Sequence, residues 1–309
     1  MADVRAPAPT GPIDPVALAR LGGLPIQARV IVEGALAGLH RARVHGSSVE
    51  FAEHKLYTPG DELRHVDWKA YARRGRYYVK QFDQEAQLTT YLVLDASASM
   101  AFDGGGAAKL DYATWLLAAL AYLICAQQDA VGLITFGEAR SAQAVPARAS
   151  AGHLRAILDE LERVRAGGGR GRQGAGVALA RVAELAGRRR ALIIVATDLF
   201  DPDDAVVPAL RHLRGRGHDV VCLHVLAPHE RTFPYDGLTR FVGLESEQAL
   251  MANPAAIRAT YLARLDAFLA RCAEELRTAG VDYLATTTDV APAEVVRELL
   301  VARAGRGRR

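Results

Sequence analysis

Cysteine is scarce in this sequence. Its 309 residues include three cysteines, Cys125, Cys222 and Cys272, which stand far apart inside apolar segments. No CxxC or Cys/His pair suggests a zinc or redox site, so we predict buried, reduced thiols. Reduced thiols are typical of the cytoplasm, and we expect the protein there.

Long apolar runs are also missing. None reaches the roughly 18–20 residues that a membrane span needs, so we expect no span. The longest run, Tyr112–Cys125, predicts a buried helix. The N-terminus is rich in Ala and Pro without the apolar core of a secretory signal, and residues 1–14 are predicted to be a disordered lead-in.

A strong charge of either sign is absent. The net charge is +3, which is too small to indicate a nucleic-acid partner. Basic residues gather in Lys69–Lys80 and at residues 303–309, without the interleaved aromatics of single-strand binding. We therefore expect no nucleic-acid partner, and we interpret residues 303–309 as a basic tail.

The first part of the chain predicts a helix followed by a small appendage. Apolar residues at helical spacing predict a helix over 15–40, broken at Gly22–Pro25. Residues 44–53 and 77–82 alternate like strands, and Pro59-Gly60 predicts a turn before a short helix capped by Asp61. We take residues 15–87 as an N-terminal helix with a β-containing appendage that packs on the rest.

From residue 88 to 302, strands and helices alternate. The predicted strands are 91–95, 130–136, a short piece near 142–145, 191–197, 219–226 and 281–286. The predicted helices are 109–127, 149–164, 173–186, 203–214, 254–279 and 292–302, with an irregular acidic stretch after residue 226. This order predicts an α/β domain with a mostly parallel sheet and helices on both faces.

The clearest candidate site follows the strand that starts at Tyr91. Asp95, Ser97 and Ser99 come at its end, spaced two apart, and Asp198 follows the strand 191–197. Parallel strands end at the same edge of a sheet, so these oxygens should lie close together. Hard cations such as Mg²⁺ prefer oxygen ligands. The alternative is that Asp95 caps a turn and the serines bond to backbone.

Other motifs fit enzymes poorly. Gly169–Gly174 spells GxGxxG, but a predicted helix precedes it where a dinucleotide site needs a strand. Ser97 stands where a haloacid-dehalogenase phosphatase needs its second Asp, and no GxSxG elbow is present. His65 and the acidic loop Asp201, Asp203 and Asp204 are interpreted as structural.

Several motifs together resemble a known family. They are Gly46–Glu53, Tyr57-Thr-Pro-Gly-Asp61, Arg64, Asp67-Trp68, Ala72-Arg73 and Tyr78–Phe82, followed by Asp95-Ala-Ser-Ala-Ser99. The chain resembles the von Willebrand factor A-like proteins called domain of unknown function 58, from about Arg41 to the last strand.

The resemblance implies a Rossmann-like A-type domain with a metal-ion-dependent adhesion site. Asp95, Ser97, Ser99 and Asp198 match its ligand positions, with Mg²⁺ or Mn²⁺ as the ion. A Thr of the family pattern is replaced by Gln173, whose amide oxygen can still ligate an ion or hold a water. No catalytic activity is implied.

The family is also associated with MoxR-type AAA+ ATPases, which makes such an ATPase the expected protein partner. Arg64, Arg73 and Arg74 are the candidate docking residues; internal pairing with Asp61 and Asp67 is their alternative role. We thus expect a non-enzymatic, metal-dependent adaptor or co-chaperone. A metal-free scaffold with a degenerate site and a metal-dependent hydrolase are the two other interpretations.

Overall fold

The chain divides into two units. The computed structural model describes residues 13–43, 54–56, 78–80, 88–137, 144–150, 152–167, 174–201, 204–244 and 248–306. One unit combines Met1–Leu39 with Thr89–Arg309, and the other is His40–Leu88. The sequence predicted one N-terminal segment of residues 15–87, whereas in the structure residues 15–39 belong to the unit that contains the large sheet. In the second unit, β1 (His54–Leu56) pairs antiparallel with β2 (Tyr78–Lys80).

The larger unit is built on a six-stranded sheet with the order β10-β7-β6-β3-β4-β5. Its strands are β3 (Thr89–Asp95), β4 (Ala130–Phe136), β5 (Ala144–Arg148), β6 (Ala191–Thr197), β7 (Asp219–Leu226) and β10 (Asp282–Thr287). All neighbours run parallel except β4 and β5. The continuous apolar runs of β3, β4 and β6 are buried, as strands covered on both faces should be.

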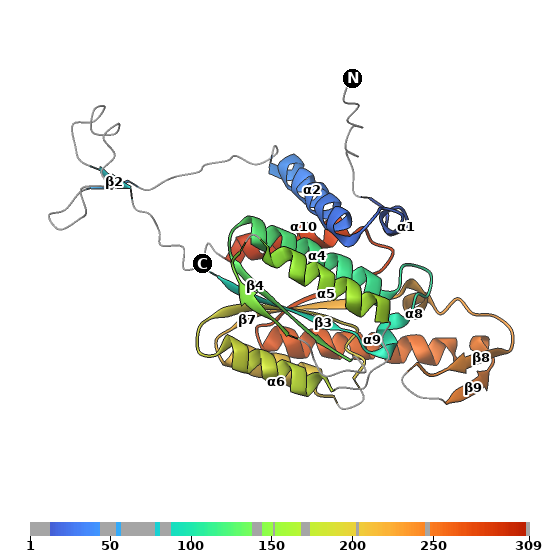
Figure 1. Cartoon of the computed structure of the whole chain (residues 1–309). Coiled ribbons are helices and arrows are strands. Elements are labelled where there is room, and N and C mark those ends of the chain that lie inside the picture. The colour runs from blue at the N-terminus through green and yellow to red at the C-terminus, as the bar shows by residue number, and fades with distance from the viewer. Residues whose placement is uncertain are drawn as a thin grey trace, which may run out of the picture. The chain divides into compact units, whose positions relative to one another are not determined.

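Helices cover both faces of this sheet, as Figure 1 shows. One face carries α4 (Lys109–Ala126), α5 (His153–Gly167) and α10 (Pro292–Arg306). The other face carries α6 (Ala175–Ala186), α7 (Val206–Gly215) and α9 (Pro254–Thr278). The predicted mostly parallel α/β sheet with helices on both faces is therefore confirmed.

Helix α4 is a core helix of this unit. By length and composition it is the one helix in the described ranges that could cross a membrane, and 67% of it is buried inside the protein. Its side chains from Tyr112 to Ala121 are almost entirely shielded by the sheet and by α5 and α10. Burial of this kind agrees with the predicted buried helix.

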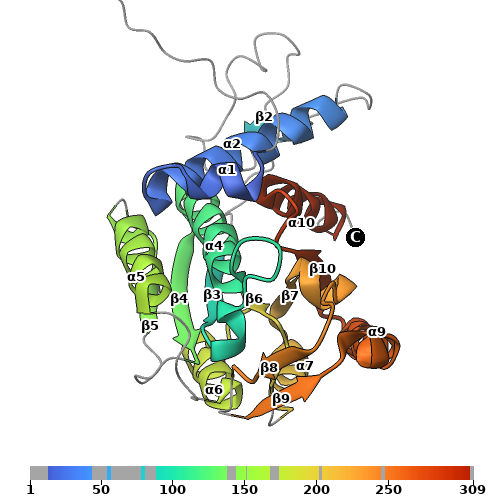
Figure 2. The same ribbon diagram turned by 90° about the vertical axis from the view of Figure 1, so that its right-hand side faces the viewer.

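Helices α1 (Pro15–Ala19) and α2 (Leu24–Arg43) add a layer over α4, α5 and α10 (Figure 2). The Leu24 N–H donates to Glu162 of α5, and Gly34 lets α2 approach Ala293 of α10 closely. The predicted break between the two helices is present. The Gln27 amide holds it by donating to the Leu18 and Leu21 carbonyls.

Two predictions need correction. The stretch after β7 was expected to be irregular, but it contains α8 (Pro228–Thr232) and an antiparallel hairpin of β8 (Thr239–Val242) and β9 (Ala249–Ala252). The basic tail was expected from residue 303, but α10 continues to Arg306. Arg303 lies 3.7 Å from Asp219 and 3.9 Å from Asp282, and these ion pairs hold the last turns of α10.

Other predictions lie outside the described residues. They are most of the lead-in 1–14, the extended stretch 44–53, the Pro59-Gly60 turn and the short helix after Asp61. Elsewhere helix starts shift by a few residues. Helix α7 begins at Val206 because Asp201 accepts from the Ala205 and Val206 N–H groups and caps it there. Asp201 thus has the structural role that the sequence suggested.

Candidate functional site

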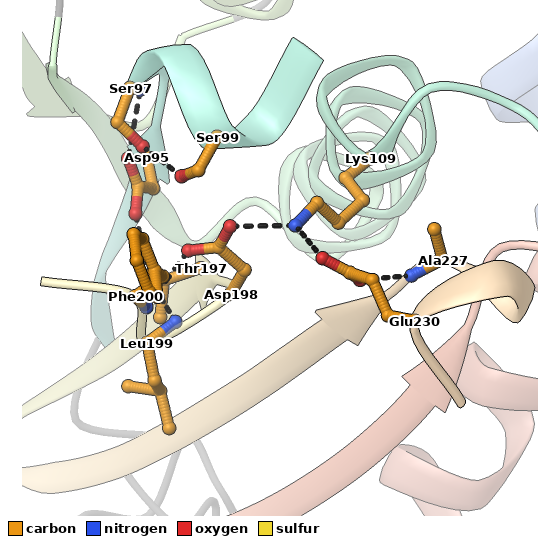
Figure 3. Close-up of polar contacts among 10 residues, drawn as sticks. All are labelled: Asp95, Ser97, Ser99, Lys109, Thr197, Asp198, Leu199, Phe200, Ala227 and Glu230. Atoms are coloured by element: carbon orange, nitrogen blue, oxygen red, sulfur yellow. Dashed lines mark hydrogen bonds and ion pairs between the residues drawn. The ribbon is translucent and has the colours of Figure 1, made fainter. Parts of the chain in front are cut away.

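Asp95 stands at the carboxyl end of β3, the strand between β4 and β6. Its side chain is buried. One carboxylate oxygen accepts from the Ser97 N–H at 2.9 Å, and the other accepts from the Thr197 hydroxyl at 2.7 Å (Figure 3). Both bonds fix the orientation of the carboxylate at the edge of the sheet.

The two serines follow at the start of a 3₁₀ turn, η2 (Ala98–Ala101). The Ser97 and Ser99 hydroxyl oxygens lie 3.0 Å apart, and Ser99 is buried. Gly137, at the end of β4, has a φ of 79°, and a Cβ there would collide with the Ser97 backbone nitrogen. Glycine is therefore required where β4 passes beside this loop.

Asp198 follows β6 and is also buried. One of its oxygens accepts from the Phe200 N–H at 3.0 Å, and the other contacts the Lys109 ammonium at 2.7 Å. Central neighbouring strands thus deliver Asp95 and Asp198 to the same edge, as predicted from the sequence.

Lys109 begins α4 and is 2% exposed. Its ammonium also contacts a Glu230 oxygen at 2.8 Å, and the other Glu230 oxygen accepts from the Ala227 N–H at 2.6 Å. Burial acts to lower the pKa of Lys109, but Asp198 and Glu230 together raise it above its ordinary value. Lys109 is therefore a charged ammonium locked between two carboxylates.

The site holds more negative than positive charge. Burial and the nearby charge of Asp198 raise the pKa of Asp95 to about 7, even though Thr197 and Ser97 hydrogen-bond to its carboxylate. A raised acid pKa means that the ionised form is costly in this environment. A cation beside Asp95 would remove that cost.

The chemistry of the donors fits such a cation. Two carboxylates and two hydroxyls are hard oxygen donors of the kind that Mg²⁺ and Mn²⁺ accept, with water completing the shell. In the described ranges, no group of three or more His, Cys, Asp or Glu is placed to hold a metal. An ion here would therefore depend on Ser97 and Ser99 in addition to the carboxylates.

Of the predicted site residues, Asp95, Ser97, Ser99 and Asp198 lie at one edge of the sheet (Figure 3). Gln173 and the three candidate docking arginines, Arg64, Arg73 and Arg74, lie outside the described residues.

Sequence reasoning missed Thr197, Lys109 and Glu230. Each had a weak signal. Thr197 directly precedes Asp198, Lys109 is the one basic residue of the apolar helix that it opens, and Glu230 lies in the acidic stretch.

Known proteins resemble this chain in sequence and structure. The uncharacterized proteins Rv1480 of Mycobacterium tuberculosis (strain ATCC 25618 / H37Rv) and Mb1516 of Mycobacterium bovis are each 30% identical over 281 residues, covering 89% of this chain and 86% of theirs.

Among solved structures, an aerotolerance-related membrane protein from Bacteroides fragilis NCTC 9343 is 19% identical with a TM-score of 0.48, covering 68% of this chain and 97% of that one. BatB from Bacteroides thetaiotaomicron is 16% identical with a TM-score of 0.44, covering 71% and 99%. The SpRpn10 VWA domain is 16% identical with a TM-score of 0.33, covering 45% and 75%. Likeness at this level supports no argument about function.

The family comparison is more informative. The model of the family described as "Protein of unknown function DUF58" matches residues 53–267, which include most of the second unit, both carboxylates of the site and Lys109. The match covers more than half of the chain and agrees with the resemblance in the motifs, so this protein belongs to the DUF58 family.

Proposed function

We propose that this protein is a non-enzymatic protein-interaction module whose binding depends on a divalent cation at Asp95, Ser97, Ser99 and Asp198. The observation that carries the proposal is that Asp95 and Asp198, both buried, stand at the ends of neighbouring strands beside two serine hydroxyls. Burial, and after it the charge of Asp198, raises the pKa of Asp95 to about 7, which agrees with a place for a cation. Ser97 and Ser99 supply neutral oxygens next to that charge, 3.0 Å from each other.

The four residues alone would supply too little negative charge to a bound divalent ion. Two serine hydroxyls carry no charge, and Asp198 shares its charge with Lys109. A cation so placed attracts a further carboxylate, which a partner protein can offer. Bound Mg²⁺ or Mn²⁺ would supply this attraction, while the protein's own residues orient and shield it.

An exposed aromatic side chain next to the site supports a protein as the ligand. Phe200, two residues after Asp198, is 62% exposed. Aromatic residues are enriched at protein interfaces. We propose a MoxR-type AAA+ ATPase as the partner, with Arg64, Arg73 and Arg74 as further docking residues and the cytoplasm as the location.

A metal-free scaffold is the second candidate, and Lys109 is the observation in its favour. Its ammonium already occupies the Asp198 oxygen that an ion would use. A hydrolase is less well supported. The charge of Asp198 acts on His224, but burial lowers the pKa of His224 to about 4. The His224 ring is also hydrogen-bonded to the Tyr283 hydroxyl in the core, so it is poorly placed to act as a base.

Binding of the purified ATPase tests the proposal. The MoxR-type ATPase of the source organism should bind wild type in Mg²⁺, and binding should fall at least about tenfold in EDTA or with Asp95→Ala. Asp103→Asn is the matched control, since it removes an exposed carboxylate that follows the serine loop in the chain. Equal binding with and without Mg²⁺ would favour the scaffold, and ester or phosphate turnover lost in Asp95→Ala would favour the hydrolase.

A further inference from the structure

Lys109 is an unusual neighbour for a cation site. A buried ammonium is costly unless it is paired, and Lys109 is paired with two carboxylates, at 2.7 Å from Asp198 and 2.8 Å from Glu230. Its side chain and that of Asp198 are 2% and 1% exposed, so water screens their interaction little. The positive charge of Lys109 therefore acts with little screening on any cation that binds Asp198.

An ion and this ammonium compete for the same carboxylate. Asp198 gives one oxygen to the Phe200 N–H and the other to Lys109. A divalent cation at Asp95 and the serines would have to share Asp198 with Lys109, and the two positive charges would repel each other. We propose that Lys109 is the residue that sets the ion affinity of this site, by occupying Asp198 and holding the affinity down. The inference rests on the proposed function, because the ion is the one proposed there.

Glu230 works in the opposite direction. Its first oxygen shares the Lys109 ammonium with Asp198, and its second accepts from the Ala227 N–H at the start of α8. With Glu230 neutral, Lys109 would face Asp198 alone, and ion binding should weaken. With both charges gone, the formal charge of the Lys109, Glu230 and Asp198 group is unchanged, but Asp198 is freed.

Two variants isolate the effect of Lys109. Glu230→Gln and the double variant Lys109→Met/Glu230→Gln differ only at position 109. The introduced amide oxygen can still accept from the Ala227 N–H in both. Lys109→Met alone would leave the buried Asp198 and the partly buried Glu230 without a cation. It is a poor test, because the resulting loss of stability could by itself prevent folding.

Calorimetric titration with MnCl₂ or MgCl₂ measures the effect, with the melting temperature as a check of folding. We expect Glu230→Gln to bind several-fold more weakly than wild type. The double variant should bind at least about tenfold more tightly than Glu230→Gln, because one nearby positive charge is removed. Adding Asp95→Ala to the double variant should abolish binding. If Lys109 only joins α4 to β6, the two variants will bind the ion equally, and the proposal is overturned.

The outcomes also separate this inference from the proposed function. If wild type shows no binding while the double variant binds through Asp95, the ion dependence of the native protein fails, but the restraint by Lys109 is supported. If wild type binds and the two variants agree, the restraint fails and the proposed function stands. If no form binds an ion, both are overturned.

Discussion

At the scale of single residues, Asp95 carries a charge that the fold makes costly. Its carboxylate is buried beside Asp198, and its pKa rises from 3.8 to about 7. Thr197 and Ser97 hydrogen-bond to it and lower this cost without removing it. Strongly shifted pKa values gather at functional sites, and the cation that we propose would offset this cost.

This shift predicts the pH dependence of stability in EDTA. Between about pH 4 and pH 7 the folded protein holds a proton on Asp95 that the unfolded chain has lost, so Asp95 makes stability fall as pH rises. The urea-unfolding free energy is measured for wild type and for Asp95→Asn at each pH, and the second is subtracted from the first. The contributions of the other titrating groups then cancel. The difference should fall by a few kcal/mol across this range. A flat difference would show that Asp95 ionises freely in the fold.

Lys109 makes a second prediction at this scale. Lys109→Met should lower the free energy of unfolding by about 3–5 kcal/mol, since it leaves the buried Asp198 and the partly buried Glu230 near each other without a cation. Lys109→Met/Glu230→Gln should recover part of that loss. Urea denaturation of both at pH 7 is the measurement, and equal losses in the two variants would contradict the pairing.

The sequence could reveal only part of this cluster. Asp95, Ser97 and Ser99 are neighbours in the chain, and Asp198 ends a recognisable buried strand, so pattern and topology suffice to bring them together. Lys109 meets Asp198 across 89 residues and Glu230 across 121. No local pattern encodes contacts at that separation, because they depend on how α4 and α8 pack.

At the scale of elements, strands with continuous apolar runs were predicted most accurately. Strands β4, β6 and β7 have the predicted bounds, because full burial demands such runs. The β8–β9 hairpin was missed for the opposite reason. Its strands have four residues each and are largely exposed, so neither length nor an apolar run marks them.

Gly137 lies at the end of β4, where its backbone passes close to Ser97 of the site. Gly137→Ala should lower the melting temperature by several degrees and weaken ion binding, because a Cβ at φ 79° would strain the backbone and press on Ser97. Gly215→Ala is the matched control. Gly215 ends α7, and no atom lies within 4 Å of the position that its Cβ would take, so this change should be close to neutral. Equal melting temperatures for both variants would contradict this role of Gly137.

At the scale of the whole sheet-bearing unit, the N-terminal helices form part of the fold. Leu18, Leu24 and Ile31 are buried, although the entire second unit separates these helices from the sheet in the sequence. Helical spacing predicted these helices. Helical spacing could not predict that these helices pack over α4, α5 and α10. It shows which face of a helix is apolar, but not which other element that face contacts.

Close packing of α2 on α10 can be tested by substitution. Gly34→Leu should destabilise the protein by about 1–3 kcal/mol, because a Cβ there already lies 3.1 Å from the Ala293 methyl group. Gly22→Leu is the control, as no atom lies within 4 Å of a Cβ at that glycine. Thermal unfolding distinguishes them, and an equally small effect of both would mean that α2 does not pack tightly there.

The most direct measurement is the thermal stability of the protein with increasing Mg²⁺ or Mn²⁺. Wild type and the control Asp103→Asn should both gain melting temperature as the ion rises, because an ion that binds the folded state stabilises it. Asp95→Ala should gain nothing under the same conditions. Equal gains in wild type and Asp95→Ala, or no gain in any of the three, would contradict an ion site at Asp95, Ser97, Ser99 and Asp198.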